Sequence, residues 1–256
     1  MIELSHWYGR LGNNIQQCAI GTMVARNNRG TFISKNNHEI ILTHQTSFGQ
    51  SDASQVSKFF YYEGDYKEVD LQPKQVYEEM REICRDFVGY YLDVPKVNVP
   101  DDTIVIHVRS GDVFDKQVEN PVNYVPNPMR YYRQLIDSFD HAIVVTENDN
   151  HNPIVDELRK DLKVTVQSLT VGEDFATLLG AKHLASSGVG TFAVSAALCS
   201  KNIKHFYCSD VHITEHLNWR MLLDTDVKVH LMELPNYIKP GEWANSEEQR
   251  QFILSY

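Results

Sequence analysis

Residues 103–208 alternate between short apolar strands and amphipathic helices, and this alternation constrains the fold more than any other feature. The apolar, β-branched run 104–108 is too short for a helix and predicts a strand. The pattern then predicts helices at 129–139, 153–162, 174–182 and 191–200, and strands at 142–146, 163–167, 184–186 and 203–208. Such alternation is typical of a parallel sheet with helices on both faces. We therefore expect an α/β fold whose C-terminal part is Rossmann-like in build.

The chain is predicted to divide in a polar linker that contains Pro95 and Pro100. Residues 1–100 would form an N-terminal domain and residues 101–235 the Rossmann-like domain. Residues 236–256 would pack back on the N-terminal domain as a C-terminal helix. The N-terminal domain is weakly patterned. Its expected elements are a helix capped by Asn13 or Asn14, strands at 31–34, 39–43 and 59–62, and a helix at 74–92.

Composition argues against several classes of protein. In 256 residues, 42% apolar content is enough to fill a core, and the net charge of −10 argues against a nucleic-acid or anionic-membrane partner. The four cysteines are far apart and lack metal-ligand spacing, so we expect reduced, buried thiols and no metal. Without a signal peptide or membrane-spanning run, the sequence predicts a soluble cytoplasmic protein. It leaves the oligomeric state open.

The strand at 103–109 ends abruptly in the polar loop Arg109-Ser110-Gly111-Asp112. His107 and Arg109 are two residues apart, so both leave the sheet on the same face, with Arg109 at the carboxyl end. Ligands of open α/β sheets bind at that end. Because a guanidinium is a fixed cation with a planar donor fork, we expect Arg109 to hold the diphosphate of a nucleotide-sugar.

A second junction between strand and helix follows residue 185. Small residues there let the backbone approach a ligand, and the helix N-terminus favours negative charge. The residues expected to contact the phosphates are Ser187, Gly188, Gly190, Thr191 and Phe192. Alternatively, the glycines merely permit a tight turn. Asp174, at the start of the preceding helix, could accept hydrogen bonds from a base edge or could be an ordinary first-turn acid.

A third glycine-containing loop lies near the N-terminus. Gly9 and Gly12 bracket a turn that leads into a helix, with Arg10 between them and Asn13 after them. The loop could bind an anion or a sugar hydroxyl, or it could be an ordinary first helical turn. The spacing is not that of a dinucleotide-binding loop, and no strand of useful length is predicted before it.

These motifs together resemble those of the α-1,2-fucosyltransferases. The segment 8–19, with Gly-Arg-Leu-Gly-Asn-Asn, is similar to their G-x-L-G-N-Q motif, and 107–112 resembles their H-x-R-R-G-D motif. Residues 174–198, with Thr191-Phe192, resemble a third motif that usually reads Asn-Ser-Thr-Phe-Ser-Trp-Trp. The tail segment 240–243, Pro-Gly-Glu-Trp, is similar to an end pattern of such enzymes. The matches keep the family's order and span nearly the whole chain.

The resemblance implies an inverting, metal-independent glycosyltransferase of the two-domain GT-B type. The donor would be GDP-β-L-fucose or a close GDP-sugar such as GDP-rhamnose, and a carbohydrate would be the acceptor. Arg109 would contact the diphosphate, Asp174 the guanine, and the loop 187–191 the phosphates. Arg10, Gly12 and Asn13 would line the cleft from an acceptor-side N-terminal domain.

Three departures from the family pattern bear on this prediction. Ser110 stands where the family has a second Arg, the third motif contains glycines and an extra residue, and two tryptophans after Phe192 are absent. A non-catalytic GDP-sugar-binding module is therefore the alternative to an enzyme. The candidates for a general base are His107 and Asp112, because both are beside the donor loop. His107 could instead be a hydrogen-bonded core residue, and Asp112 could simply fix its turn.

Overall fold

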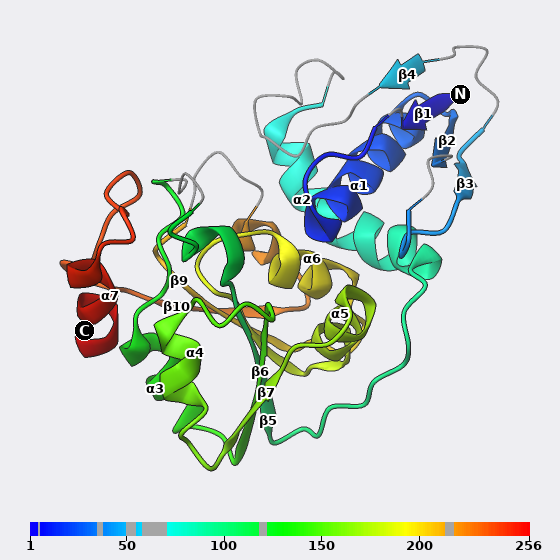
Figure 1. Ribbon diagram of the computed structural model, residues 1–256. Coiled ribbons are helices and arrows are strands. Elements are labelled where there is room, and N and C mark those ends of the chain that lie inside the picture. The colour runs from blue at the N-terminus through cyan, green and yellow to red at the C-terminus, as the bar shows by residue number, and fades with distance from the viewer. Residues whose placement is uncertain (5, 35–37, 50–54, 58–70, 118–121, 213–217) are drawn as a thin grey trace.

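The computed structural model contains two sheets, one formed by strands between residues 2 and 57 and one by strands between residues 103 and 232 (Figure 1). It describes residues 1–256 except for 5, 35–37, 50–54, 58–70, 118–121 and 213–217. The predicted strand at 59–62 lies outside the described residues.

The C-terminal sheet consists of six parallel strands. They are β5 (Thr103–Val108), β6 (His141–Thr146), β7 (Val164–Gln167), β8 (His183–Ala185), β9 (His205–Ser209) and β10 (Lys228–Met232). Their order across the sheet is β10-β9-β8-β5-β6-β7. Strands β6 and β7 are added in turn on one side of β5. The chain then crosses back, and β8, β9 and β10 are added in turn on the other side. This is the Rossmann strand order, and the order reverses between β5 and β8.

Helices cover both faces of this sheet. On one face are α3 (Met129–Ile136) and α4 (Pro153–Leu158), and on the other are α5 (Val171–Gly180) and α6 (Phe192–Cys199). Successive residues of β5 reach opposite faces, because Ile104 belongs to the hydrophobic cluster around α3 while Val105 belongs to the cluster around α6. The predicted α/β class with a parallel sheet is confirmed, and the predicted strand bounds differ by only one or two residues.

The N-terminal sheet has the order β3-β2-β1-β4 within the described residues. The short strand β1 (Ile2–Leu4) leads through α1 (Leu11–Asn27) to β2 (Thr31–Ser34), which pairs parallel with it. β4 (Gln55–Ser57) is also parallel to β1, whereas β3 (His44–Ser47) is antiparallel to β2. Two predictions were wrong here: β1 does precede the glycine loop, and the strand predicted at 39–43 begins only at residue 44.

Helix α1 begins at Leu11, earlier than predicted, and Arg10 is its N-cap without a side-chain hydrogen bond. The two asparagines expected to cap it bond elsewhere. Asn14 Nδ2 donates to the carbonyl of Tyr8 at 2.9 Å, and Asn13 Oδ1 accepts from the hydroxyl of Thr191. Helix α5 also begins early, because Thr170 and Glu173 form a reciprocal capping box at its start.

The two parts of the chain share one hydrophobic core. Helix α2 (Pro73–Asp86) is followed by a 3-10 turn, η2 (Val88–Tyr91), and packs with α1 against α6. The cluster contains Ile15 of α1, Met80 of α2, Ala196 of α6 and Phe206 of β9. The N-terminal helices are therefore fixed to the C-terminal sheet and its helices by apolar packing and not only by the linker.

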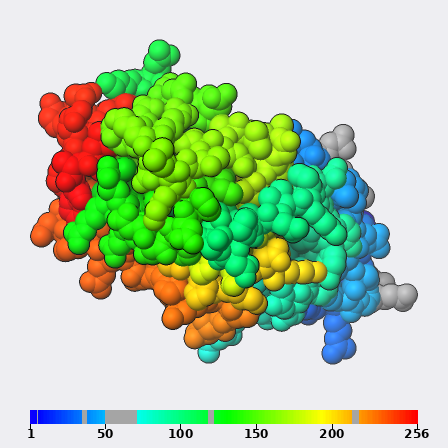
Figure 2. All heavy atoms as spheres, turned by 90° about the horizontal axis from the view of Figure 1, so that it is seen from below, coloured from blue at the N-terminus to red at the C-terminus, as the bar shows by residue number. Residues whose placement is uncertain are grey.

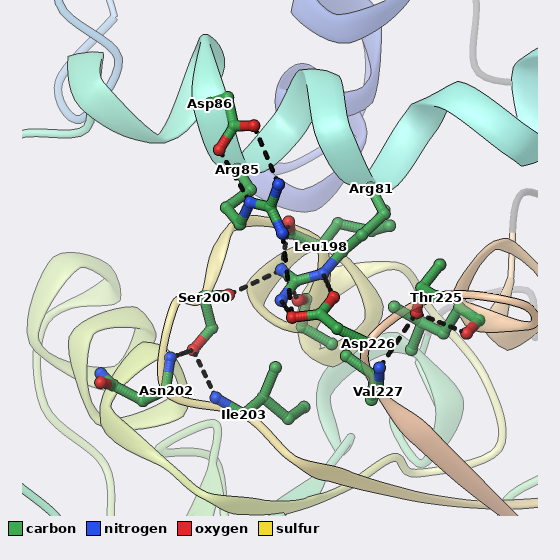
Figure 3. Close-up of polar contacts among 12 residues, drawn as sticks. Arg81, Arg85, Asp86, Leu198, Ser200, Asn202, Ile203, Thr225, Asp226 and Val227 are labelled. Atoms are coloured by element: carbon green, nitrogen blue, oxygen red, sulfur yellow. Dashed lines mark hydrogen bonds and ion pairs between the residues drawn. The ribbon is translucent and has the colours of Figure 1, made fainter.

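A buried guanidinium reinforces this junction (Figure 3). Arg81 Nη1 of α2 donates to the carbonyls of Ala197, Leu198 and Ser200 at 2.8, 2.7 and 2.6 Å. Its Nε donates to Asp226 Oδ1 at 3.2 Å. Those carbonyls lie at the C-terminal end of α6, where the helix cannot bond them itself and where a cation is favoured.

The sequence predicted that the C-terminal helix packs back on the N-terminal domain. This prediction was wrong for α7 (Glu247–Ser255). It packs against α3 and α4, and in Figure 2 it lies at the opposite end of the molecule from the N-terminal segment. Two interactions anchor this tail to the loop after β5: Trp243 Nε1 donates to the carbonyl of Val113 at 3.1 Å, and Arg250 Nη2 donates to that of Phe114. The buried indole and Ile253 thus select this face.

All four cysteines are buried and free, as predicted. Within the part of the chain that the structure describes, no helix has the length and apolar character to cross a bilayer.

Candidate functional site

A cavity of about 690 Å³ lies at the carboxyl ends of β5 and β6, between the two parts of the chain. Segments from both parts form its walls. The N-terminal part contributes residues 9–14, 38 and 39. The C-terminal part contributes His107, Arg109, Asp112, Tyr124, residues 145–148, 168, 169, 171, Asp174 and residues 190–192. The cavity is thus beside the point where the strand order reverses, which is where ligands bind in sheets of this type.

The cavity brings together most of the residues that the sequence singled out. Those that line it are Arg10, Gly12, Asn13, His107, Arg109, Asp112, Asp174, Gly190, Thr191 and Phe192. Ser187 and Gly188, which were also expected to contact the phosphates, do not line it. The buried Ser187 hydroxyl donates to the Val189 carbonyl at 2.8 Å, and the side of Gly188 where a Cβ would lie faces Asn127. The binding roles themselves stay predictions.

Arg109 points into the cavity from the end of β5, and its guanidinium is held on three sides. It donates to both carboxylate oxygens of Asp112 at 2.8 Å. It lies 5.1 Å from the centre of the Tyr124 ring, a cation–π contact. A Cβ at Gly190 would be only 2.8 Å from Arg109 Nη1, and the φ of +89° at this position favours glycine. The backbone of Gly190 therefore lies close against the Arg109 guanidinium.

Arg10 reaches the same wall from the N-terminal part. Its Nη1 donates to Glu147 Oε1 at 2.6 Å, and its Nη2 is 3.8 Å from Asp112. The Arg10 side chain is 62% exposed, so the pair itself adds little stability. The role of this ion pair is to position the Arg10 guanidinium beside that of Arg109.

Two carboxylates after β6 fix the loop that follows Arg109. Glu147 Oε2 accepts from the backbone N–H of Ser110 at 2.6 Å, and Asp149 accepts from the Ser110 hydroxyl and the Gly111 N–H, both at 2.6 Å. Ser110, which stands where the α-1,2-fucosyltransferase motif has a second Arg, is buried and bonded to Asp149. Sequence reasoning missed both carboxylates. The signal was their place directly after the strand predicted at 142–146.

His107 is a neutral imidazole inside the wall. Burial is the main cause that lowers its pKa to about 4; Glu147 opposes this shift, and the nearby guanidinium groups of Arg109 and Arg10 add to it. The Ser187 hydroxyl donates to Val189, so it can only accept from His107 Nδ1, 3.4 Å away. This leaves the lone pair on Nε2. With such a pKa, His107 is a weak proton acceptor near neutral pH.

Asp174 lines the cavity and is engaged within the protein. Its Oδ1 accepts from Gln167 Nε2 at 2.8 Å, and both oxygens accept from the Leu169 N–H at 3.2 Å. Burial raises the pKa of its carboxyl group, while these hydrogen bonds oppose that shift. Asp174 thus fixes the turn that lines the cavity. The apolar side chains of Val145, Leu169 and Phe192 line the cavity near this turn.

The cavity is lined by more acidic side chains than arginines. Two guanidinium groups, of Arg10 and Arg109, accompany the carboxylates of Glu39, Asp112, Glu147 and Asp174. No group of three or more histidine, cysteine or acidic residues among the described residues has the arrangement of a metal site.

Fold and cavity together define the class: an α/β protein with a Rossmann-order parallel sheet and a ligand-sized cavity where the strand order reverses. Comparisons of the chain with models of protein families, with curated proteins and with solved structures found no match.

Proposed function

We propose that this protein is an inverting, metal-independent glycosyltransferase that moves L-fucose from GDP-β-L-fucose to a hydroxyl of a glycan acceptor, with the two parts of the chain in a GT-B arrangement. The observation that carries the proposal is the meeting of Arg10 and Arg109 in one cavity at the carboxyl edge of the sheet. Two guanidinium groups, one from each part of the chain, suit a diphosphate, whose charge grows as the sugar departs.

The donor would occupy the cavity from end to end. The diphosphate would displace Asp112 from part of the Arg109 fork, and Tyr124 would keep the guanidinium in place. The nucleoside would extend toward Leu169 and Asp174, where apolar side chains suit a flat base and polar groups suit its edge. Glu147 and Asp149 would keep the 110–111 loop rigid without touching the donor.

Two observations favour a second candidate, a non-catalytic GDP-sugar-binding module. Both arginines are paired with carboxylates, and Ser110 offers its hydroxyl to Asp149 and not to the cavity. Fewer donors are then available for a departing phosphate. A transferase of the same fold that uses another GDP-sugar, such as GDP-rhamnose, would share every feature of the site described above.

The proposal is tested by calorimetric titration with GDP and with UDP, first without metal and then with Mg²⁺. We expect metal-independent GDP binding that Arg109→Ala weakens at least 100-fold, because the variant loses the charged donor fork, worth about 3 kcal/mol. The matched control is Arg133→Ala, which removes an exposed arginine of α3 that does not line the cavity. It should leave the affinity unchanged.

Turnover of GDP-β-L-fucose then separates the candidates. Formation of the α-anomer by the wild-type protein supports the transferase, whereas GDP-fucose binding without turnover supports the module. Preference for UDP, or GDP affinity that Arg109→Ala leaves intact, would contradict the assigned site.

A further inference from the structure

The four carboxylates that line the cavity differ in whether they already have a hydrogen-bond or ion-pair partner within the protein. Asp112 accepts from the Arg109 fork, Glu147 from Arg10 and from a backbone N–H, and Asp174 from Gln167 and a backbone N–H. The oxygens of these three carboxylates already accept from partners within the protein. Each of the three therefore has a structural role.

Glu39 is the exception. It lines the cavity, it is exposed, and among the described residues no hydrogen bond or ion pair engages its carboxylate. The turn that carries it is nevertheless well fixed. His38 Nδ1 accepts from the backbone N–H groups of Ile40 and Ile41 at 3.0 and 3.1 Å, so its proton is on Nε2, which donates to Asn14 Oδ1 at 3.1 Å. A free carboxylate is thus presented on a rigid turn.

Glu39 shares the cavity with the two arginines that would hold the departing phosphate, Arg109 of the C-terminal sheet and Arg10 of the N-terminal part. Inversion requires the attacking hydroxyl to approach the sugar on the side away from the leaving group. Among the described residues Glu39 forms no ion pair with either arginine, so its carboxylate is available to meet that hydroxyl.

We propose that Glu39 is the general base of the transfer, an inference that rests on the proposed function. The acceptor oxygen forms a bond to the anomeric carbon while the bond from that carbon to the β-phosphate oxygen breaks. The electron pair of the broken bond stays on GDP, beside Arg109 and Arg10. The hydroxyl proton passes to the Glu39 carboxylate, so the products are the inverted glycoside, GDP and a protonated Glu39.

The test uses GDP-β-L-fucose as donor with water and with sodium azide as nucleophiles, so that the natural acceptor is not needed. We expect Glu39→Gln to lower kcat for release of α-fucose at least 100-fold and to leave GDP affinity within about twofold. Azide carries no proton, so it should restore turnover of Glu39→Ala and give α-fucosyl azide.

Glu233→Gln is the matched control, because Glu233 is an exposed glutamate that does not line the cavity. If Glu39→Gln keeps more than a tenth of the wild-type rate, or if azide fails to rescue Glu39→Ala, the inference is overturned while the transferase stands. A wild-type protein that binds GDP but turns over neither nucleophile is a binding module, which overturns the inference with the donor site intact. A wild-type protein that does not bind GDP overturns both proposals.

Discussion

His107 shows how burial decides the chemistry of a single side chain. The imidazole lies between Ser187 and the ring of Phe192, whose centre is 5.2 Å away. Water is excluded there, so the neutral form is favoured and the pKa falls to about 4. The sequence indicated only that His107 and Arg109 share a face. It could not indicate which of the two would be buried.

The depressed pKa predicts how stability depends on pH. In the unfolded chain His107 takes up a proton near pH 6.5, whereas in the folded protein it does so only near pH 4. The unfolded state therefore binds more protons between these values, so His107 makes stability fall as the pH decreases from 6.5 to 4, by about 3 kcal/mol in total. We expect His107→Gln to lose less stability than wild type between pH 7 and pH 4, as measured by urea denaturation.

The exposed His141→Gln serves as the control for that experiment and should behave as wild type. An equal loss of stability on acidification in wild type and His107→Gln would show that the buried imidazole is not the group responsible.

At the junction of α2 with α6, one helix supplies hydrogen-bond donors to the last carbonyls of the other. Helix α6 ends at Cys199 against the N-terminal helices, and its last carbonyls have no partner within the helix. Arg81 supplies those donors from a buried position, with only 3% of its surface exposed. Arg85, one turn later on α2, reaches the same Asp226 at 3.8 Å but bonds mainly to Asp86 (Figure 3). The two arginines therefore form a matched pair.

Arg81→Met keeps the apolar stem but leaves buried carbonyls without donors. We expect it to lower the free energy of unfolding by about 3 kcal/mol, since buried acceptors deprived of a charged donor are costly. Arg85→Met should cost less than about 1 kcal/mol, because that pair is partly exposed. Guanidinium chloride denaturation of the two variants gives the comparison, and similar losses in both would contradict the capping role of Arg81.

The whole molecule depends on a close approach between its two parts at the mouth of the cavity. A Cβ at Gly12 would lie 2.7 Å from the Thr191 carbonyl carbon and 2.6 Å from its hydroxyl, so only glycine lets α1 reach the start of α6. The Gly12 carbonyl accepts from the Ser195 hydroxyl at 2.8 Å, and Gln16 Nε2 donates to the same hydroxyl at 3.2 Å. Gly12 thus sets the spacing of the cavity walls.

We expect Gly12→Ala to destabilise the protein by about 1–3 kcal/mol, because the added methyl group meets backbone that cannot move freely. It should also weaken GDP binding by displacing Arg10 from Arg109. Gly172→Ala is the control, since a Cβ there would meet its neighbours at 3.9–4.0 Å and a helix favours Ala. Thermal unfolding and GDP titration measure both effects, and a Gly12→Ala protein as stable as Gly172→Ala would disprove the close contact.

Sequence alone determined the features that depend on local periodicity. The alternation after residue 102 predicted a parallel sheet with helices on both faces, and the run 104–108 placed Arg109 at the carboxyl edge of its strand. Asn152 and Pro153 at the start of α4 follow the rules for helix N-termini, and Asn152 Oδ1 accepts from the Ile154 N–H at 3.0 Å. Such signals involve neighbours within one turn or one strand, so they can be detected in the sequence.

Only the tertiary structure decided which distant residues meet. Arg10 and Glu147 are 137 positions apart, and neither shows in the sequence that the other is its partner. The same holds for Glu39, whose free carboxylate is meaningful only once Asp112, Glu147 and Asp174 are seen to be engaged. The C-terminal helix packs against α3 and α4 because Trp243 and Ile253 belong to the same hydrophobic cluster as the apolar side chains of those helices. Periodicity gives each segment an apolar face, but shape and charge complementarity in the folded chain decide what that face meets.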